Sequence, residues 1–245
     1  MFYVAGKRMR SEVSTLTLAS NHLLDALPGD VRDAVMRELE RVTLPLRTTI
    51  YEPGERIGYV YFPLDGIISV VTVMRDGTQI EVVTIGREGI SGAQGLLDDG
   101  MATALTFVQI AGDYYRLSFE RFVALCARYG PLRALVEKYL SALLDVMAQS
   151  IACNRLNYVN QRIARWLLMT HDRVWRDEFR LTHEVLATML GVRRAGVSIA
   201  AAGLQQAGCI SYSRGRFTVV DRTGLEGAAC ECYAAIEEAY ARRRS

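Results

Sequence analysis

Short apolar segments separated by turn residues run from about Thr43 to Leu117. Between two of these segments lies Asp76-Gly77, the strongest short-range signal for a β-hairpin. Strands that recur at a spacing of roughly ten residues are typical of a small antiparallel barrel or jelly roll. The segments that we expect to form strands are Thr48–Tyr51, Tyr59–Phe62, Ile67–Val73, Gln79–Ile85, Ala104–Val108 and Tyr114–Leu117.

Helices are predicted on both sides of this β region. The shorter one, Asp30–Arg41, has its apolar residues on one face. Pro131 suits the first turn of a long helix, and the stretch from there to Arg173 has no further Gly or Pro. The periodicity is lost over Asn154–Asn160, where we expect a break that acts as a hinge. The apolar face of the shorter helix carries Val31, Val35 and Leu39.

The segment Leu181–Asp221 has the layout of a winged helix-turn-helix. Thr182 can cap a first helix by accepting hydrogen bonds from free N–H groups, and Gly191 ends that helix. A second helix follows over Arg193–Gln206, and two short strands come next, joined by Ser213-Arg214-Gly215-Arg216. This order of elements predicts a module that binds double-stranded DNA.

The distribution of charge supports this interpretation. The chain of 245 residues has a net charge of only +2. Residues 153–222, however, hold 11 Arg against 5 Asp or Glu, whereas residues 1–152 have a net charge of −3. No acidic residue lies between Glu184 and Asp221. A basic block beside an acidic one indicates a nucleic-acid module joined to a different domain.

Specific residues of this module are candidates for DNA contact. Arg193 and Arg194, at the start of the second helix, can bond bidentately to guanine in the major groove. Phosphate contacts position a protein without reading sequence, and we assign them to the wing and to the start of the first helix. The full candidate set is Thr182, His183, Arg193, Arg194, Gly196, Ser198, Arg214 and Arg216.

The long helix carries two neighbouring apolar stripes. One stripe would suffice to pack it on the β region, so two stripes favour contact with the same helix of a second subunit. Helix-turn-helix proteins commonly bind two half-sites as dimers, which favours a homodimer over a wide core face in a monomer. We assign the interface to Leu132, Val136, Tyr139, Leu143 and Val146; the second stripe is Leu140, Leu144, Met147 and Ile151.

Enzymatic chemistry has no visible basis in the sequence. Metal-dependent enzymes with a β-barrel hold their metal through histidines and a carboxylate, but Thr43–Leu117 contains no His and no Cys. Nucleophile-elbow, Walker and zinc-finger motifs are also missing, and the glycines of Gly86-Arg87-Glu88-Gly89 are better explained by turn geometry. We expect no catalysis and no cofactor.

The cysteines and the apolar segments indicate the compartment in which the protein is expected. Five cysteines, odd in number and widely spread, indicate reduced thiols in a cytosol. Cys153 lies near the predicted dimer seam, where a buried thiol is favoured over a cross-link. Cys230 and Cys232 lie two apart in a predicted helix over Leu225–Arg244, so they should not face each other, and we expect no metal site. No apolar stretch reaches the ~18 residues of a membrane span, and the N-terminus has no signal-peptide core, so we expect a cytoplasmic protein.

The order of barrel, long helix and winged helix resembles the Crp/Fnr family of bacterial transcription regulators, over about residues 15–222. The segment 191–199 reads Gly-Val-Arg-Arg-Ala-Gly-Val-Ser-Ile and is similar to the family motif G-[VC]-S-R-E-T-V-S-R. Arg194 falls on a base-contacting Arg of that motif, whereas Ala195 and Ile199 replace its Glu and second Arg. The resemblance implies an operator that differs from the usual family site, with Arg193 as a replacement contact.

The resemblance also locates an effector pocket. Cyclic-nucleotide binders of the family use a Gly-Glu pair for the ribose and an Arg for the phosphate. Here Gly92 is kept, but Ala93 and Thr103 take the Glu and Arg positions, and no Arg lies between Arg87 and Arg116. A buried phosphate needs a cation, so we do not expect cyclic nucleotide binding. The pocket candidates, which fit an apolar ligand or are filled by their own side chains, are Gly92, Ala93, Leu96, Leu97, Met101, Thr103 and Ala104.

Together these observations predict an α+β protein. We expect a β-roll sensor domain over residues 1–130, a dimerisation helix and hinge over 131–159, and a winged helix-turn-helix domain with a C-terminal helix over 160–245. The predicted function is a homodimeric, sequence-specific DNA-binding regulator, with RNA polymerase as a further partner and an unknown small-molecule effector. The alternative is a sensor that binds an apolar or unknown small ligand in the β-roll and passes its signal through a protein contact.

Overall fold

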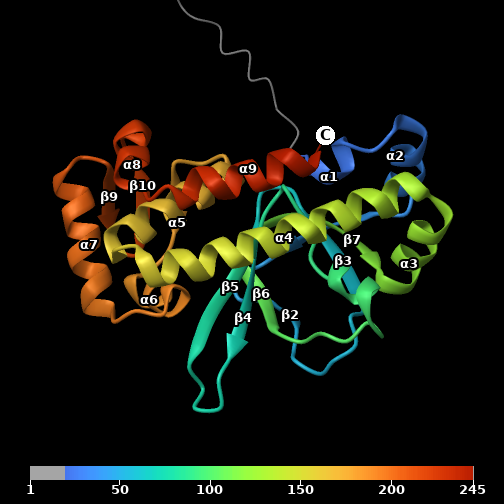
Figure 1. Ribbon diagram of the computed structural model, residues 1–245, viewed down its shortest axis with the longest axis horizontal. Coiled ribbons are helices and arrows are strands. Elements are labelled where there is room, and N and C mark those ends of the chain that lie inside the picture. The colour runs from blue at the N-terminus through green and yellow to red at the C-terminus, as the bar shows by residue number, and fades with distance from the viewer. Residues whose placement is uncertain (1–19, 245) are drawn as a thin grey trace, which may run out of the picture.

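The computed structural model describes residues 20–244 (Figure 1). Its N-terminal half is a β-roll of two antiparallel sheets, as predicted. In one sheet the order is β1-β7-β3, and in the other it is β2-β6-β4-β5. The strands are β1 (Glu40–Leu44), β2 (Thr49–Tyr51), β3 (Tyr59–Pro63), β4 (Ile67–Val73), β5 (Gln79–Ile85), β6 (Leu105–Ile110) and β7 (Gly112–Ser118).

The roll forms because its strands place apolar side chains inward. Val60, Phe62, Ile67 and Ile68 on β3 and β4 are almost completely buried, as expected for strands with both faces covered. The predicted hairpin joins β4 and β5, with Gly77 in the left-handed conformation at a φ of 83°. This hairpin projects from the lower edge of the molecule in Figure 1.

The helix predicted over Asp30–Arg41 is shorter than expected. The structure has α1 (His22–Asp25) and α2 (Gly29–Met36), and the chain turns into β1 at Glu40. Leu39 therefore lies outside the helix, although it still packs against the main core. Pairing of β1 with β7 outweighs the local helical pattern, because tertiary contacts override weak propensity. A helix that the pattern did not predict, α3 (Phe119–Arg128), follows the roll.

The long helix α4 (Gly130–Leu156) crosses the molecule beside the roll (Figure 1). The predicted break is present, because α4 ends at Leu156 and α5 (Val159–Val174) begins two residues after Asn157. Asn157 and Tyr158 have extended backbone angles between the two helices. The break allows α5 to leave the direction of α4 and enter the core of the C-terminal domain.

The C-terminal domain is a winged helix-turn-helix, also as predicted. Its core collects apolar residues from α5, both helices of the motif and the wing, including Ile163, Leu186, Val197 and Phe217. A third strand, β8, which the pattern did not predict, completes a sheet of order β8-β10-β9. The elements are β8 (Glu178–Arg180), α6 (His183–Leu190), α7 (Arg194–Gln206), β9 (Ile210–Ser213) and β10 (Arg216–Val219).

The C-terminal tail forms two helices rather than the single helix predicted from Leu225. These are α8 (Arg222–Ala228) and α9 (Cys232–Arg244). The second of them runs along α4 of the same chain (Figure 1). Within residues 20–244, no single helix combines the length and apolar character of a membrane span; only α6 and α7 taken together, bent by 112°, pass that test of length and composition.

Candidate nucleic-acid interface

The helix-turn-helix presents the start of α7 to the outside of the molecule. Thr182 caps α6 by accepting a hydrogen bond from the N–H of Val185 at 3.2 Å, and Gly191 ends that helix with a φ of 61°. The angle of 112° between α6 and α7 is typical of helix-turn-helix motifs. This turn directs the N-terminal end of α7 outward, where Arg193 and Arg194 are both exposed.

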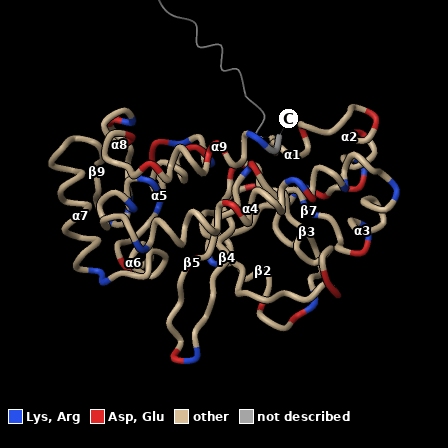
Figure 2. Tube along the Cα trace, in the orientation of Figure 1, with Lys and Arg blue, Asp and Glu red and all other residues tan. Residues whose placement is uncertain are grey.

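The outer face of α7 fits the close approach of a double helix. Figure 2 shows basic residues where α6 and α7 meet, at the end of the molecule farthest from α3. A Cβ added at Gly196 would meet no atom within 4 Å, so the space beside this residue is open. Arg194 lies 3.5 Å from the carboxylate of Glu184, and both side chains are exposed. An exposed ion pair of this kind contributes little and can yield to a guanine edge or a phosphate.

His183 and Ser198 bind each other inside the module. The imidazole Nδ1 and the Ser198 hydroxyl are 3.0 Å apart, and the ring stacks on Tyr212 with centroids separated by 4.1 Å. Desolvation, and then the charge of Arg194, lower the pKa of His183, which favours the neutral ring. The structure therefore places His183 in the packing between α6, α7 and the wing, where it does not act as a cation for phosphate.

The wing is a tight turn between β9 and β10. Arg214 and Gly215 both adopt positive φ, at 50° and 76°, and Arg214 is exposed at the turn. Arg216 pairs with Glu178 of β8 at 2.6 Å, with both side chains about half exposed. Such a surface pair contributes little to stability, so the wing keeps two arginines that are available to a phosphate backbone.

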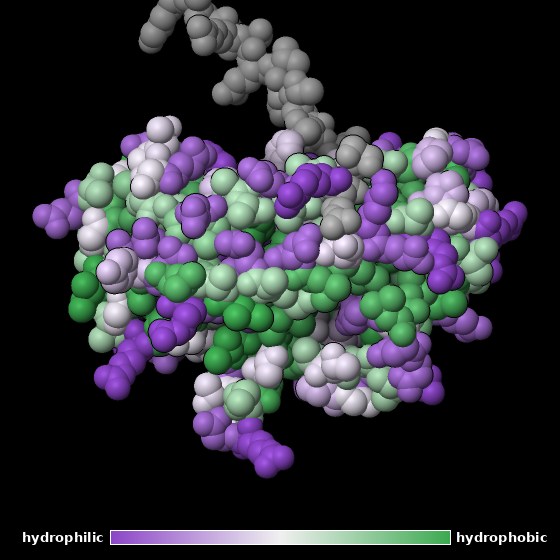
Figure 3. Space-filling model, in the orientation of Figure 1, coloured by the Kyte–Doolittle hydropathy of each residue, from purple (hydrophilic) through white to green (hydrophobic). Residues whose placement is uncertain are grey.

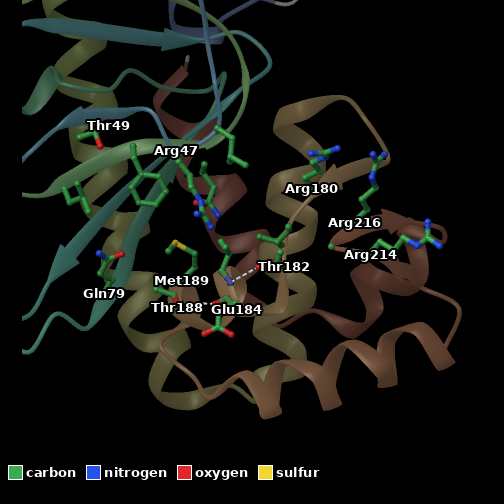
Figure 4. A pocket seen from close by; sticks show the side chains of 17 residues that line it. Arg47, Thr49, Gln79, Arg180, Thr182, Glu184, Thr188, Met189, Arg214 and Arg216 are labelled. Atoms are coloured by element: carbon green, nitrogen blue, oxygen red, sulfur yellow. Dashed lines mark hydrogen bonds between the residues drawn. The ribbon is translucent and has the colours of Figure 1, made fainter.

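A cavity of about 780 Å³ separates the roll from the winged domain (Figure 4). The walls combine apolar side chains, arginines, uncharged polar side chains and the carboxylate of Glu184. Three of the predicted DNA contacts, Thr182, Arg214 and Arg216, line it. Gln109 also lines it, and the Nε2 group of that buried side chain has no hydrogen-bond partner. Arg193 and Arg194 do not line this cavity.

The protein's own side chains occupy the space beside two glycines of the predicted effector pocket. Gly92 begins the 3₁₀ helix η1 (Ala93–Leu97), and a Cβ there would lie 2.5 Å from the hydroxyl of Tyr51. Phe119 fills the space beside Gly95 in the same way, with a ring atom at 2.8 Å. Leu97 and Thr103 are exposed and do not line the interior, so their assignment to the pocket was wrong. The short helix turns Leu97 outward and leaves Leu96 packed on the core.

The predicted dimer interface is also wrong in its residues. The assigned stripe, Leu132, Val136, Tyr139, Leu143 and Val146, is buried in the main core of the single chain. The second stripe contains the exposed positions: 63% of Leu144 and 72% of Ile151 are accessible. Figure 3 shows hydrophobic residues gathered along α4 on this face. The main core includes the first stripe and Leu140 of the second stripe, so the exposed apolar positions of the second stripe are Leu144 and Ile151.

A buried ion pair, which the sequence did not reveal, joins the winged domain to the roll. The guanidinium of Arg173 on α5 lies 2.8 Å from the carboxylate of Glu88, and it also donates to the hydroxyl of Thr84. Only glycine fits at position 86, since a Cβ there would lie 2.4 Å from the Arg173 side chain. Burial alone would raise the pKa of Glu88, but the charge and hydrogen bonds of Arg173 hold it below its usual value.

A second carboxylate at the same joint has a different partner set. Glu81 on β5 accepts hydrogen bonds from the indole N–H of Trp166 at 2.9 Å and from the hydroxyl of Ser69 at 2.7 Å. Desolvation raises the pKa of Glu81 above its usual value, against the effect of these donors. Two carboxylates of the roll therefore contact α5. Glu88 does so through an ion pair with Arg173, and Glu81 through a hydrogen bond from the uncharged indole of Trp166.

Comparisons with known proteins agree with this arrangement. Residues 41–129 match the family model described as a cyclic nucleotide-binding domain, and residues 161–228 match the Crp-like helix-turn-helix domain. No curated protein matches the chain. Among solved structures, FixK2 from Bradyrhizobium japonicum is 14% identical with a TM-score of 0.65, and the match covers 78% of this chain and 98% of that one.

Two further structures resemble the chain to a similar degree. A transcriptional regulator of the CRP family from Thermus thermophilus is 23% identical with a TM-score of 0.61, and the match covers 79% of this chain and 99% of that one. The c-di-GMP responsive global regulator CLP of Xanthomonas campestris is 18% identical with a TM-score of 0.60. That match covers 78% of this chain and 99% of the regulator. At these identities the likeness establishes a shared fold.

Proposed function

The chain belongs to the Crp/Fnr family of transcription regulators, and from this premise we propose that it binds specific double-stranded DNA as a homodimer. The observation that carries the proposal is the exposed N-terminal end of α7, where the side chains of Arg193 and Arg194 are both accessible. In a helix-turn-helix this end enters the major groove and contacts base edges. Arg214 and Arg216 in the wing then contact phosphates.

The operator is expected to differ from the usual family site. Ala195 and Ile199 present no group that can hydrogen-bond a base edge, and Ile199 is exposed on the reading face. An exposed aliphatic side chain can contact the methyl group of thymine. Binding of a duplex from the gene's own upstream region, followed by fluorescence anisotropy, tests the proposal. Tight binding of that duplex and weak binding of its scrambled counterpart is the expected result; equal binding of both contradicts it.

The homodimer is proposed to form through the exposed stripe of α4. Leu144 and Ile151 lie seven residues apart, a spacing that places both on one seam between two helices. Burying one such side chain contributes about 1.5–3 kcal/mol. Because each substitution occurs in both subunits, Leu144→Glu or Ile151→Glu should weaken the dimer by roughly a hundredfold or more.

Sedimentation velocity over a concentration series measures this effect. The matched control is Val123→Glu, which changes an exposed apolar residue on α3 and should leave the dimer intact. A dimer that persists unchanged in both α4 variants would place the interface elsewhere.

Regulation by a cyclic nucleotide is not part of the proposal. The side chains of Tyr51 and Phe119 fill the space beside Gly92 and Gly95, and Thr103 stands where the cyclic-nucleotide binders of the family carry the phosphate-binding Arg. We keep the division into a roll (1–130), a dimerisation helix and hinge (131–159) and a DNA-binding domain (160–245). RNA polymerase is a proposed further partner, which transcription from the bound promoter in vitro would test.

A further inference from the structure

Three cysteines from different parts of the chain meet beside the hinge. The Sγ atoms of Cys153, Cys230 and Cys232 all lie within 4.8 Å of one another, and all three residues are buried. Cys153 is near the end of α4, whereas Cys230 lies in the connection before α9 and Cys232 begins that helix. The sequence-based expectation that Cys230 and Cys232 face apart was wrong, because Cys230 is outside the helix.

The separation of the sulfur atoms fits a shared metal ion. Thiolates bound to one ion at about 2.3 Å lie roughly 3.8 Å apart. The Sγ atoms of Cys153 and Cys230 are 3.5 Å apart, and the third lies within the same limit of 4.8 Å. Small adjustments of side-chain torsions would bring all three sulfurs to equal distances from a common centre.

Polar groups around the cluster are placed to support a thiolate. The side-chain amides of Gln149 and Asn157 each donate to the sulfur of Cys232, at 3.1 Å and 3.4 Å. Hydrogen bonds to a ligand sulfur are the usual outer support of a metal site. Two amide donors directed at one sulfur favour the negatively charged thiolate over the neutral thiol.

Two buried cations add a second, independent indication. Arg162 and Arg165 on α5 are each only 6% exposed, and the Nε group of each has no hydrogen-bond partner. The guanidinium of Arg162 donates to the backbone carbonyl of Leu190, and that of Arg165 donates to the sulfur of Met169, and both of these acceptors are uncharged. Arg165 lies within electrostatic range of Cys153, and Arg162 within range of Cys153 and Cys230. Buried charges require compensation, and a thiolate cluster supplies it.

We propose that Cys153, Cys230 and Cys232 bind one thiophilic metal ion of the Cu⁺ or Zn²⁺ class through three thiolates. Soft sulfur ligands select these ions. Three ligands and two nearby guanidinium groups favour Cu⁺, because three thiolates, two cations and one monovalent ion sum to zero charge. Structural Zn²⁺ is almost always four-coordinate and would need a further ligand.

The position of the site gives it a regulatory role, which rests on the proposed function. The cluster joins α4 to the connection between α8 and α9. Its member on α4, Cys153, lies four residues before Asn157, where the break between α4 and α5 begins. Metal occupancy therefore fixes the end of the dimerisation helix against the DNA-binding domain. We expect DNA affinity to change about tenfold between the metal-free and metal-loaded protein, within the usual range of coupling between two sites.

Titration of the reduced full-length chain with Cu⁺, and separately with Zn²⁺, against a coloured chelator tests the site without DNA. The expected result is one ion per chain, a thiolate-to-metal absorption band, and tighter binding of Cu⁺. Cys153→Ser, Cys230→Ser and Cys232→Ser should each weaken binding by at least about a hundredfold, because each removes a ligand, and loss of an outer partner alone costs about 10–100-fold. Cys126→Ser and Cys209→Ser, which change buried cysteines outside the cluster, are the matched controls and should bind normally.

Two outcomes would overturn the site. One is binding no tighter in the wild-type chain than in the three cluster variants; the other is a Cys153–Cys230 disulfide in the isolated protein that excludes metal. Should the variants fail to fold, the absorption band and stoichiometry of the wild-type chain still decide the question. Metal binding with unchanged DNA affinity would refute the regulatory role alone, and metal binding without any DNA binding would count against the proposed function instead.

Discussion

Replacing Glu88 with Gln is expected to lower the free energy of unfolding by about 3–5 kcal/mol, because it leaves a buried charge without its partner. Arg173 and Glu88 are 5% and 10% exposed at their side chains, and their charged atoms lie 2.8 Å apart. Urea denaturation followed by circular dichroism measures the loss. The loss should be visible as a lower midpoint with little change in the slope.

Glu81→Gln is the matched control for this variant, since it changes another carboxylate at the same joint. The partners of Glu81 are the neutral donors Trp166 and Ser69, which an amide can also satisfy. Because desolvation already raises the pKa of Glu81, the neutral side chain should cost less than about 1 kcal/mol. Equal losses in the two variants would show that the Arg173 pair does not hold the joint.

The pH dependence of stability separates the two carboxylates further. The folded-state pKa of Glu88 is lowered, so its contribution is present above the unfolded value of about 4.3 and is lost as pH falls through the folded pKa. The folded-state pKa of Glu81 is raised, so its contribution has the opposite sign and is lost as pH rises. The difference between wild type and Glu88→Gln should therefore shrink in acid.

Arg194→Ala is expected to lower DNA affinity by about 1–3 kcal/mol and to relax the preference for one base pair in each half-site. Arg194 is exposed at the start of α7, where it forms a weak pair with the exposed carboxylate of Glu184. Fluorescence anisotropy on the preferred duplex and on single-base variants measures both effects. Arg216→Ala should instead weaken all duplexes alike, because a phosphate contact carries no sequence information.

The control for this comparison is Arg133→Ala. Arg133 is an exposed arginine on α4 that pairs with Glu137 one turn away, far along the chain from the helix-turn-helix. The Arg133→Ala substitution removes one positive charge outside the helix-turn-helix, so the affinity for DNA should be nearly unchanged. An Arg194→Ala protein that keeps both the affinity and the base preference of the wild type would remove the proposed readout.

The elements with strong local signals were predictable from the sequence. The Asp76-Gly77 turn, the Thr182 cap and the Gly191 stop each depend on a few neighbouring residues, and all three are present in the structure. The break between α4 and α5 also followed from the local loss of periodicity. By contrast, β1 replaced the predicted end of a helix because its partner, β7, lies about 70 residues away.

The residues that were missed depend on contacts between distant segments. Both stripes of α4 have the same apolar pattern, and only the packing of the roll and α9 decides that Val136 is buried while Ile151 is exposed. The pair of Glu88 and Arg173 spans 85 residues. In the same way, Cys153 meets Cys230 across 77 residues. Periodicity along the chain contains no information on such pairings.

The central claim, that this chain acts on DNA through its basic module, is tested most directly by the salt dependence of its binding. Arg193, Arg194, Arg214 and Arg216 on each of two subunits can release counterions from phosphates. Affinity for the upstream duplex, measured by anisotropy, should therefore fall roughly 10³–10⁵-fold between about 50 and 200 mM salt. Binding that is nearly independent of salt, or the lack of any specific complex, would contradict the account and favour a module that signals through protein contacts.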